Sequence, residues 1–186
     1  MHFLLPIGLA VIIGLVSYLF SVNKTKQALD LKSKPLQSPE LENKICALAM
    51  ALDLTHLNVN VYNIETINGL AAPGGQIYIT QGFLSKFNKG EVTATEIASV
   101  IAHELGHVAL GHTRRRMIDF SGQNALRTAL SITLNRFIPV IGPWLANLAV
   151  TIIAARMSRK DEFEADSYAT ALMLKSGLGI QSQKSL

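Results

Sequence analysis

Apolar residues recur at helical spacing in the middle of the chain. They lie three or four residues apart, on one face of a helix, at Ile97, Val100, Ile101, Leu105 and Val108. Just upstream, the letters TATE form a capping box in which Thr93 caps the helix and Glu96 reaches back to it. Gly111 is a residue type that commonly ends helices. The pattern predicts a buried helix over 94–111.

Shorter patterns surround this helix. The letters SPE at 38–40 are typical of a helix start, and an apolar stripe follows them. Apolar and polar residues alternate in LNVNVYNIE, at 57–65, and again over Gln76–Thr80, so both segments are predicted strands. A last helix is expected to begin near Ser158. These elements indicate an α+β fold that is predominantly helical, with a small sheet.

The first apolar stretch is long enough to cross a membrane. FLLPIGLAVIIGLVSYLFSV, Phe3–Val22, has no charged residue, and as a helix it would span about 30 Å, the thickness of a bilayer's hydrocarbon core. A cleaved signal peptide is the alternative, but no lysine or arginine precedes the stretch and its end is a poor cleavage site. We expect residues 1–23 to be an N-terminal transmembrane helix in contact with membrane lipid, followed by a polar tether over 24–37.

A second apolar region lies nearer the end of the chain. FIPVIGPWLANLAVTIIAA, at 137–155, contains no charged residue. Pro139, Gly142 and Pro143 interrupt its first half, and the remainder is short for a crossing. A helical connection that packs on the domain or lies in the membrane interface is favoured over a second span.

The distribution of charge predicts the side of the membrane on which the main domain lies and bears on which partners it can bind. The formal net charge is +4 and the pI is near 9.3. Lys24, Lys26, Lys32 and Lys34 follow the first apolar stretch, so the positive-inside rule predicts a single-pass protein with its main domain on the cytoplasmic side. The lone Cys46 excludes an intrachain disulfide. The sequence shows no recognition motif and no basic stripe with interleaved aromatics, so nucleic acid is not expected as a partner.

The predicted central helix carries polar residues that its burial does not explain. IASVIAHELGHVALGH contains His103, Glu104 and His107. Two imidazoles one turn apart leave the same face and can reach one ion, and zinc prefers such nitrogen ligands. Glu104, rotated about 100° from His103, borders that site and can act as general base toward a metal-activated water. Burying these groups without partners would be costly, which favours a metal site over a chance match.

A third ligand has to come from elsewhere in the chain, and SRKDEFEAD offers one. Glu162 and Asp166 are four residues apart and share one face of the last predicted helix. Glu162 can ligate a metal while Asp166 holds the other nitrogen of a ligating imidazole. Glu164 points away from this face, and Asp161 lies off it. The alternative is that these acids decorate an exposed helix start, where acids are favoured.

His103-Glu104-x-x-His107, followed by Glu162-x-x-Ala165-Asp166, resembles the M48 family of zinc metallopeptidases. NGLAAPGGQIYITQGFL is similar to that family's segment before the active-site helix, and the resemblance covers about 38–178. It implies a zincin-like domain of the gluzincin type, with one zinc ion held by His103, His107 and Glu162. Glu104 would be the catalytic base, and Asp166 would orient the imidazole of His103.

The resemblance also implies where a polypeptide substrate binds. The strand at Gln76–Thr80 would lie above the zinc as a sheet edge and pair with an extended peptide. The candidate substrate-binding residues are Asn68, Gln76, Ile77, Tyr78, Ile79 and Thr80. His112 matches a further histidine often seen in the family, and we expect it at a helix end or beside a ligand rather than as a ligand.

Two features depart from the family pattern. Gly69-Leu70 replaces the more usual Ala-aromatic pair after Asn68. Family members generally continue beyond the second motif, whereas this sequence stops at Leu186, so the predicted peptidase domain over 38–186 is a fragment or a naturally minimal form.

The expected function is that of a membrane-anchored zinc endopeptidase, and the resemblance suggests a role in protein quality control. The alternative is a non-hydrolytic zinc-binding membrane protein with a chaperone-like or scaffolding role. Glu104 distinguishes the two, because a purely structural site has no need of a carboxylate at that position.

Overall fold

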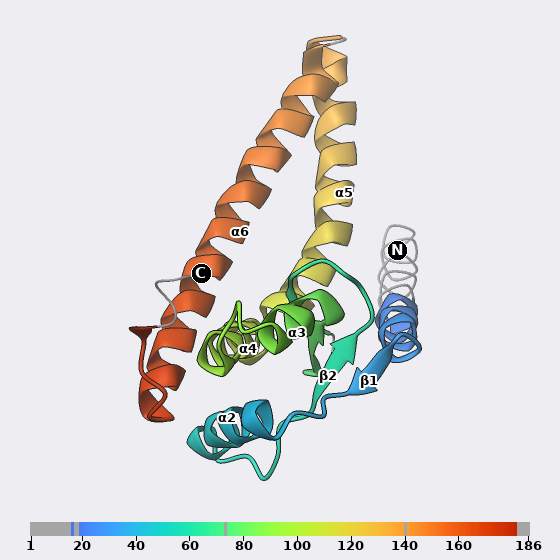
Figure 1. Ribbon diagram of the computed structural model, residues 1–186. Helices are drawn as coiled ribbons and strands as arrows, with labels where there is room; N and C mark the ends of the chain where they lie inside the picture. Colours follow the sequence, from blue (N-terminus) through green and yellow to red (C-terminus); the bar gives the residue numbers. More distant parts are fainter. Residues whose placement is uncertain (1–15, 17–18, 73, 140, 182–186) are drawn as a thin grey trace. The chain divides into compact units, whose positions relative to one another are not determined.

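The computed structural model describes residues 16, 19–72, 74–139 and 141–181 (Figure 1). The chain divides into two compact units. The first comprises Met1–Val22 and Arg114–Glu162, and its described residues are largely helical. The second comprises Asn23–Thr113 and Phe163–Leu186 and contains the sheet. The mostly helical fold with a small sheet confirms that part of the fold class predicted from the sequence.

Four short strands form one mixed sheet. They are β1 (Ser33–Pro35), β2 (Val59–Tyr62), β3 (Gly69–Ala71) and β4 (Ile77–Thr80). Their order is β1-β2-β4-β3, with β2 and β4 parallel and the two outer pairs antiparallel. Both strands predicted from alternation are present as β2 and β4. The sheet edges are β1 and β3, and β4 is an inner strand.

The core of this unit lies where the sheet meets its helices (Figure 1). The helices are α2 (Pro39–Ala51), α3 (Gln81–Asn88), α4 (Ala94–Ala109) and the last part of α6 (Ile141–Lys175). Leu48, Ile77, Ile101 and Met173 contribute completely buried side chains from α2, β4, α4 and α6. Burying an aliphatic side chain of this size contributes about 1.5–3 kcal/mol, so this core fixes where α4 lies.

Local signals in the sequence set the ends of α4. The Thr93 side chain accepts a hydrogen bond from the Glu96 backbone, and the Glu96 carboxylate accepts one from the Thr93 backbone at 2.7 Å, which confirms the predicted capping box. The helix ends at Ala109, slightly before the predicted glycine. Gly111 then takes φ = +71°, a conformation that favours glycine, and the chain turns into α5 (His112–Phe137).

The last helix is longer than the sequence analysis predicted. α6 runs without interruption from Ile141 to Lys175, so the expected start near Ser158 is wrong. Pro143 sits in its first turn, where a missing N–H is tolerated. From there to Gly177 the sequence contains neither proline nor glycine, so no residue breaks the helix.

Large apolar side chains are exposed around the junction of α5 and α6. Phe137, Ile141 and Trp144 each expose more than half of their surface, at 74%, 54% and 62%. Within the described part of the chain, α6 is the one helix long and apolar enough to cross a membrane by length and composition. The helix predicted within 137–155 is present apart from the short turn before α6. The preference for a connection over a second span stays a prediction.

The predicted anchor over 1–23 lies almost entirely outside the described residues. The segment predicted to be a polar tether, 24–37, is helical as far as Asp30 and then forms β1. The Tyr78 hydroxyl donates to Asp30 Oδ1 at 2.8 Å, which ties this segment to β4. Burial, together with the bond to Asp30 and its charge, raises the pKa of Tyr78 to about 12.

Candidate metal centre

The HExxH residues lie on the second half of α4. His103 and His107 are one turn apart, and their rings meet edge to face with centroids separated by 4.8 Å. His107 is buried, whereas His103 and Glu104 are half-buried. The completely buried Ile97 and Ile101 hold the preceding turns of α4 in the core, so the two imidazoles are presented from a fixed helix.

α4 passes very close to the final part of α6 at Gly106. A Cβ atom at Gly106 would lie 3.0 Å from the carbonyl oxygen of Ala165 and 3.1 Å from its Cα. The two backbones can approach this closely because neither residue has a large side chain, and the side chains at a contact set how near two helices come. This approach places Glu164 and Asp166, the neighbours of Ala165, beside the histidines.

Asp166 contacts the first histidine of the motif. Its Oδ1 lies 2.8 Å from Nδ1 of His103. A neutral imidazole that donates its Nδ1–H to this carboxylate leaves its Nε2 as a bare acceptor. The contact between Asp166 and His103 that the family resemblance implied is therefore present.

A second chain of contacts begins at the other histidine of the motif. Nδ1 of His107 lies 3.0 Å from Nδ1 of His112, and Nε2 of His112 lies 3.1 Å from Oε2 of Glu164. His112 is completely buried. The position of His112 at a helix end and beside His107, a candidate ligand, agrees with the expectation from the sequence. The link to Glu164 was not predicted, because Glu164 was expected to point away from the site.

The two motif histidines point the same nitrogen at each other. Their Nε2 atoms are 3.1 Å apart. Which nitrogen donates depends on the tautomers: with Nδ1–H of His103 donated to Asp166 and Nδ1–H of His107 donated to His112, both Nε2 atoms would be acceptors that face each other. Two nitrogen ligands at 2.0–2.1 Å from a tetrahedral zinc lie roughly 3.3 Å apart. The arrangement therefore fits a cation bound between the two imidazoles.

Glu104 lies beside the edge strand β3. A Cβ atom at Gly69 would lie 3.2 Å from Cγ of Glu104 and 2.6 Å from Cγ1 of Val100. The glycine that replaces the family's usual alanine thus lets β3 lie directly against α4. This contact puts the proposed base next to β3, which is an outer strand of the sheet among the described residues.

The predicted substrate strand is placed differently from what was expected. Ile77, Tyr78, Ile79 and Thr80 are completely buried, and β4 pairs with β2 on one side and β3 on the other. The expectation that this strand is a sheet edge is wrong, because both of its edges are already hydrogen-bonded. The Thr80 hydroxyl also accepts from the Asn68 and Phe83 backbones, a structural role.

Glu162, the predicted third ligand, lies on α6 one turn before Asp166 and is half-buried. It is the last residue of its unit, and Phe163 begins the segment that packs with α4. Asp161, in that same unit, is buried and accepts a hydrogen bond from Arg115 at 3.2 Å. The alternative that these acidic residues only lie on the exposed first turn of a helix is therefore wrong, because they lie inside α6 and Asp161 is buried.

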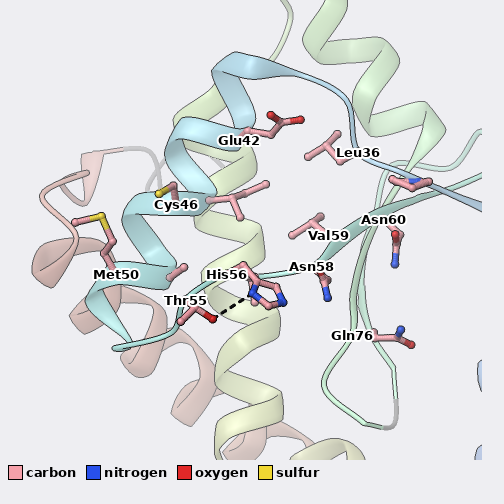
Figure 2. A pocket seen from close by; sticks show the side chains of 14 residues that line it. Leu36, Glu42, Cys46, Met50, Thr55, His56, Asn58, Val59, Asn60 and Gln76 are labelled. Atoms are coloured by element: carbon pink, nitrogen blue, oxygen red, sulfur yellow. Dashed lines mark hydrogen bonds between the residues drawn. The ribbon is translucent and has the colours of Figure 1, made fainter.

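A separate hollow lies next to α2 (Figure 2). It has a volume of about 490 Å³, and its lining includes Cys46 of α2, His56, and the amide side chains of Asn60 and Gln76. None of the HExxH residues lines it. Gln76, a candidate substrate-binding residue, also accepts a hydrogen bond from the Tyr78 hydroxyl at 3.1 Å.

Two curated proteins of the bacterium Escherichia coli are similar to this chain. It is 33% identical to "Metalloprotease YcaL" of Escherichia coli over 135 residues, which is 73% of this chain and 51% of that protein. It is 31% identical to "Metalloprotease LoiP" of the same organism over 122 residues, 66% of this chain and 46% of that protein. The chain thus spans about half the length of these relatives.

A solved structure and a family profile extend the comparison. The crystal structure of S. mikatae Ste24p matches with a TM-score of 0.55 at 20% identity, covering 94% of this chain and 50% of that one, which shows a shared fold. The profile described as Peptidase family M48 matches residues 35–186. By that match, over most of its length, the chain belongs to peptidase family M48.

Proposed function

We propose that this chain is a zinc-dependent endopeptidase. The observation that carries the proposal is the convergence of the Nε2 atoms of His103 and His107, 3.1 Å apart and directly beside Glu104 on one helix. The names of YcaL and LoiP, both metalloproteases, support the same activity. Because the chain spans about half of those proteins, the activity is proposed from the site and not transferred from them.

His103, His107 and Glu162 would hold one zinc ion. Side chains of these types can hold a metal, and two imidazoles with one carboxylate are a common zinc set that leaves a position open. Glu162 precedes Asp166 by one turn of a continuous helix, so both leave the same face of α6. A zinc ion bound there would polarise a substrate carbonyl and make a water molecule more acidic.

Glu104 would carry the proton transfers. Its carboxylate would accept a proton from the attacking water and then deliver it to the leaving amine of the scissile bond. Both roles need a carboxylate that is next to the metal ligands but free of the metal. A position directly after His103 on the helix meets this requirement, because it is rotated about 100° from the ligand.

We infer that the substrate binds on β3 and not on β4. β3 is an edge of the sheet, lies directly against Glu104 through Gly69, and has a neighbour only on its β4 side among the described strands. An extended peptide could add to this edge through backbone hydrogen bonds. Asn68 leads into β3, and its backbone pairs with Thr80, so it would lie where such a peptide ends.

Membrane attachment is proposed on two grounds. The stretch Phe3–Val22 is long enough to span a bilayer, and the exposed apolar side chains around Phe137 and Trp144 suit a lipid interface. The lysines after the first stretch would keep the peptidase unit on the cytoplasmic side. Misfolded or membrane-associated polypeptides are the proposed substrate class.

The test compares four chains, the parent and three variants, on unfolded casein, with zinc content measured by mass spectrometry. The parent should contain about one zinc per chain and cleave casein, and Glu104→Gln should keep the zinc but cleave about 10²–10⁴-fold more slowly. Glu91→Gln, an exposed exchange of the same type, should match the parent. His103→Ala should lose the zinc. Equal cleavage by Glu104→Gln and the parent would defeat the proposal, and zinc without cleavage by the parent would favour the chaperone-like alternative.

A further inference from the structure

His112 occupies an unusual place for a histidine. It is the first residue of α5, it is completely buried, and each of its ring nitrogens faces one partner. Nδ1 faces Nδ1 of His107 at 3.0 Å, and Nε2 faces Oε2 of Glu164 at 3.1 Å. A buried imidazole with both nitrogens engaged is held in one orientation, because turning the ring would break both contacts.

The chemistry of the three groups fixes which atom donates. The Glu164 carboxylate can only accept, so His112 donates from Nε2. The Nδ1 of a neutral His112 is then an acceptor, and the Nδ1 of His107 must donate to it. This tautomer puts no hydrogen on Nε2 of His107, as a metal ligand requires. The reverse direction would put a hydrogen on Nε2 of His107 and block the ligand position.

Each of the two motif histidines therefore has a hydrogen-bond acceptor at its Nδ1, but the acceptors differ. His103 donates directly to Asp166 at 2.8 Å, and its side chain is 25% exposed, so water can replace this partner. His107 is buried and reaches its carboxylate through a second imidazole. Water has little access to the buried His107, and the atom that faces its Nδ1 at 3.0 Å is Nδ1 of His112.

We propose that His112, held by Glu164, is a positioning residue that fixes the tautomer and the ring orientation of His107 for metal binding. The inference rests on the proposed zinc site and adds to it a pair of residues that do not touch the ion. Groups that accept a hydrogen bond from a metal-ligating histidine typically contribute about 10- to 100-fold to metal affinity.

The experiment measures zinc affinity by competition with a chromophoric chelator, using the full chain. His112→Leu keeps a side chain of similar size but removes the acceptor, and the zinc affinity of this variant should fall about 10- to 100-fold. His112→Asn places an amide oxygen near the former Nδ1 and should recover most of that loss. Glu164→Leu removes the carboxylate that His112 contacts. The Glu164 side chain is 36% exposed, so this exchange leaves no cavity in the core. It should weaken zinc binding in the same direction.

A spectroscopic readout separates orientation from simple loss of fold. With Co²⁺ in place of zinc, the visible absorption bands of His112→Leu and Glu164→Leu should shift relative to the parent, and those of His112→Asn should not. Parental zinc affinity in both Leu variants would overturn the proposal. Equal losses in His112→Leu and His112→Asn would also overturn it, because the acceptor would then be irrelevant. A parent that binds no zinc would instead refute the proposed function itself.

Discussion

Asp166 lies 63 positions after His103 in the chain, yet its Oδ1 is 2.8 Å from Nδ1 of that histidine. The Asp166 side chain is 70% exposed, so water screens the pair and the contact contributes little to folding. In the proposed site it would orient the imidazole and favour the tautomer in which Nε2 can bind the metal. The contact therefore matters for what the histidine can bind.

Removing the Asp166 carboxylate should separate binding from stability. We expect Asp166→Ala to lower zinc affinity about tenfold or more while the free energy of unfolding of the metal-free protein stays within about 0.5 kcal/mol of the parent. Chelator competition and urea unfolding measure the two quantities. Asp166→Asn, which keeps an acceptor oxygen, should fall between Ala and the parent. Unchanged zinc affinity in Asp166→Ala would show that this contact does not support the site.

The close approach at Gly106 should also be measurable. Gly106→Ala adds a methyl 3.0 Å from the Ala165 carbonyl oxygen, which pushes α6 away from α4, but it also removes about 1 kcal/mol of helix-propensity cost. These effects oppose each other in stability, so the free energy of unfolding should change by less than about 2 kcal/mol. Zinc affinity has no such compensation and should fall, because Glu164 and Asp166 move with α6. An affinity equal to the parent's would mean that the helix spacing is not limiting.

The sequence predicted the parts of the site that depend on local rules. The capping box at Thr93 and Glu96, the buried face of α4 and the spacing of His103 and His107 are all set by neighbours within one or two helical turns. The two inner strands were found for the same reason, since alternation needs only a few residues.

The parts that failed depend on contacts distant in the chain. Glu164 was discarded because a helical wheel turns it away from Glu162, but α4 and α6 meet at Gly106, so residues on both sides of Ala165 reach histidines. Likewise, the sequence of β4 does not distinguish an edge strand from an inner strand. The pairing with β3 on its second side makes β4 an inner strand. A single sequence contains no signal for either helix crossing or strand order.

Gly69 tests whether β3 must lie directly against α4. Gly69→Ala brings a Cβ 2.6 Å from Cγ1 of Val100, so the strand or the valine must move, at a cost of about 1–3 kcal/mol in the free energy of unfolding. Val100→Ala removes the obstructing methyl, and adding it to Gly69→Ala should recover most of that cost. A double-mutant cycle by urea unfolding measures the coupling. Strictly additive effects of the two changes would contradict the predicted contact.

Trp144 can report on the membrane, because it is the only tryptophan in the chain. Its side chain is 62% exposed on α6, so its fluorescence in buffer should be that of a hydrated indole. With vesicles of mixed neutral and anionic lipid, the emission should shift to shorter wavelength, and brominated lipid tails should quench it, since indoles favour the bilayer interface. Vesicles without bromine are the control. A shift without quenching would place Trp144 in a protein contact instead of in lipid.

Tyr78 should make the fold sensitive to alkaline pH. Its pKa is raised from 10.0 to about 12 by burial, and then by the hydrogen bond to Asp30 and the charge of that residue. The folded state therefore holds this proton more tightly than the unfolded state. The resulting stability is complete below pH 10 and disappears as the pH rises toward 12, with a total of about 2–3 kcal/mol.

The variant Tyr78→Phe has no hydroxyl proton to release at this position. Its free energy of unfolding should therefore fall less than that of the parent between about pH 9 and about pH 11.5, a range set by those two pKa values. Urea unfolding across that range measures both chains, with Tyr62→Phe on the neighbouring strand as the control for losing a tyrosine. Parallel curves for the parent and Tyr78→Phe would show that the hydroxyl does not titrate with the fold.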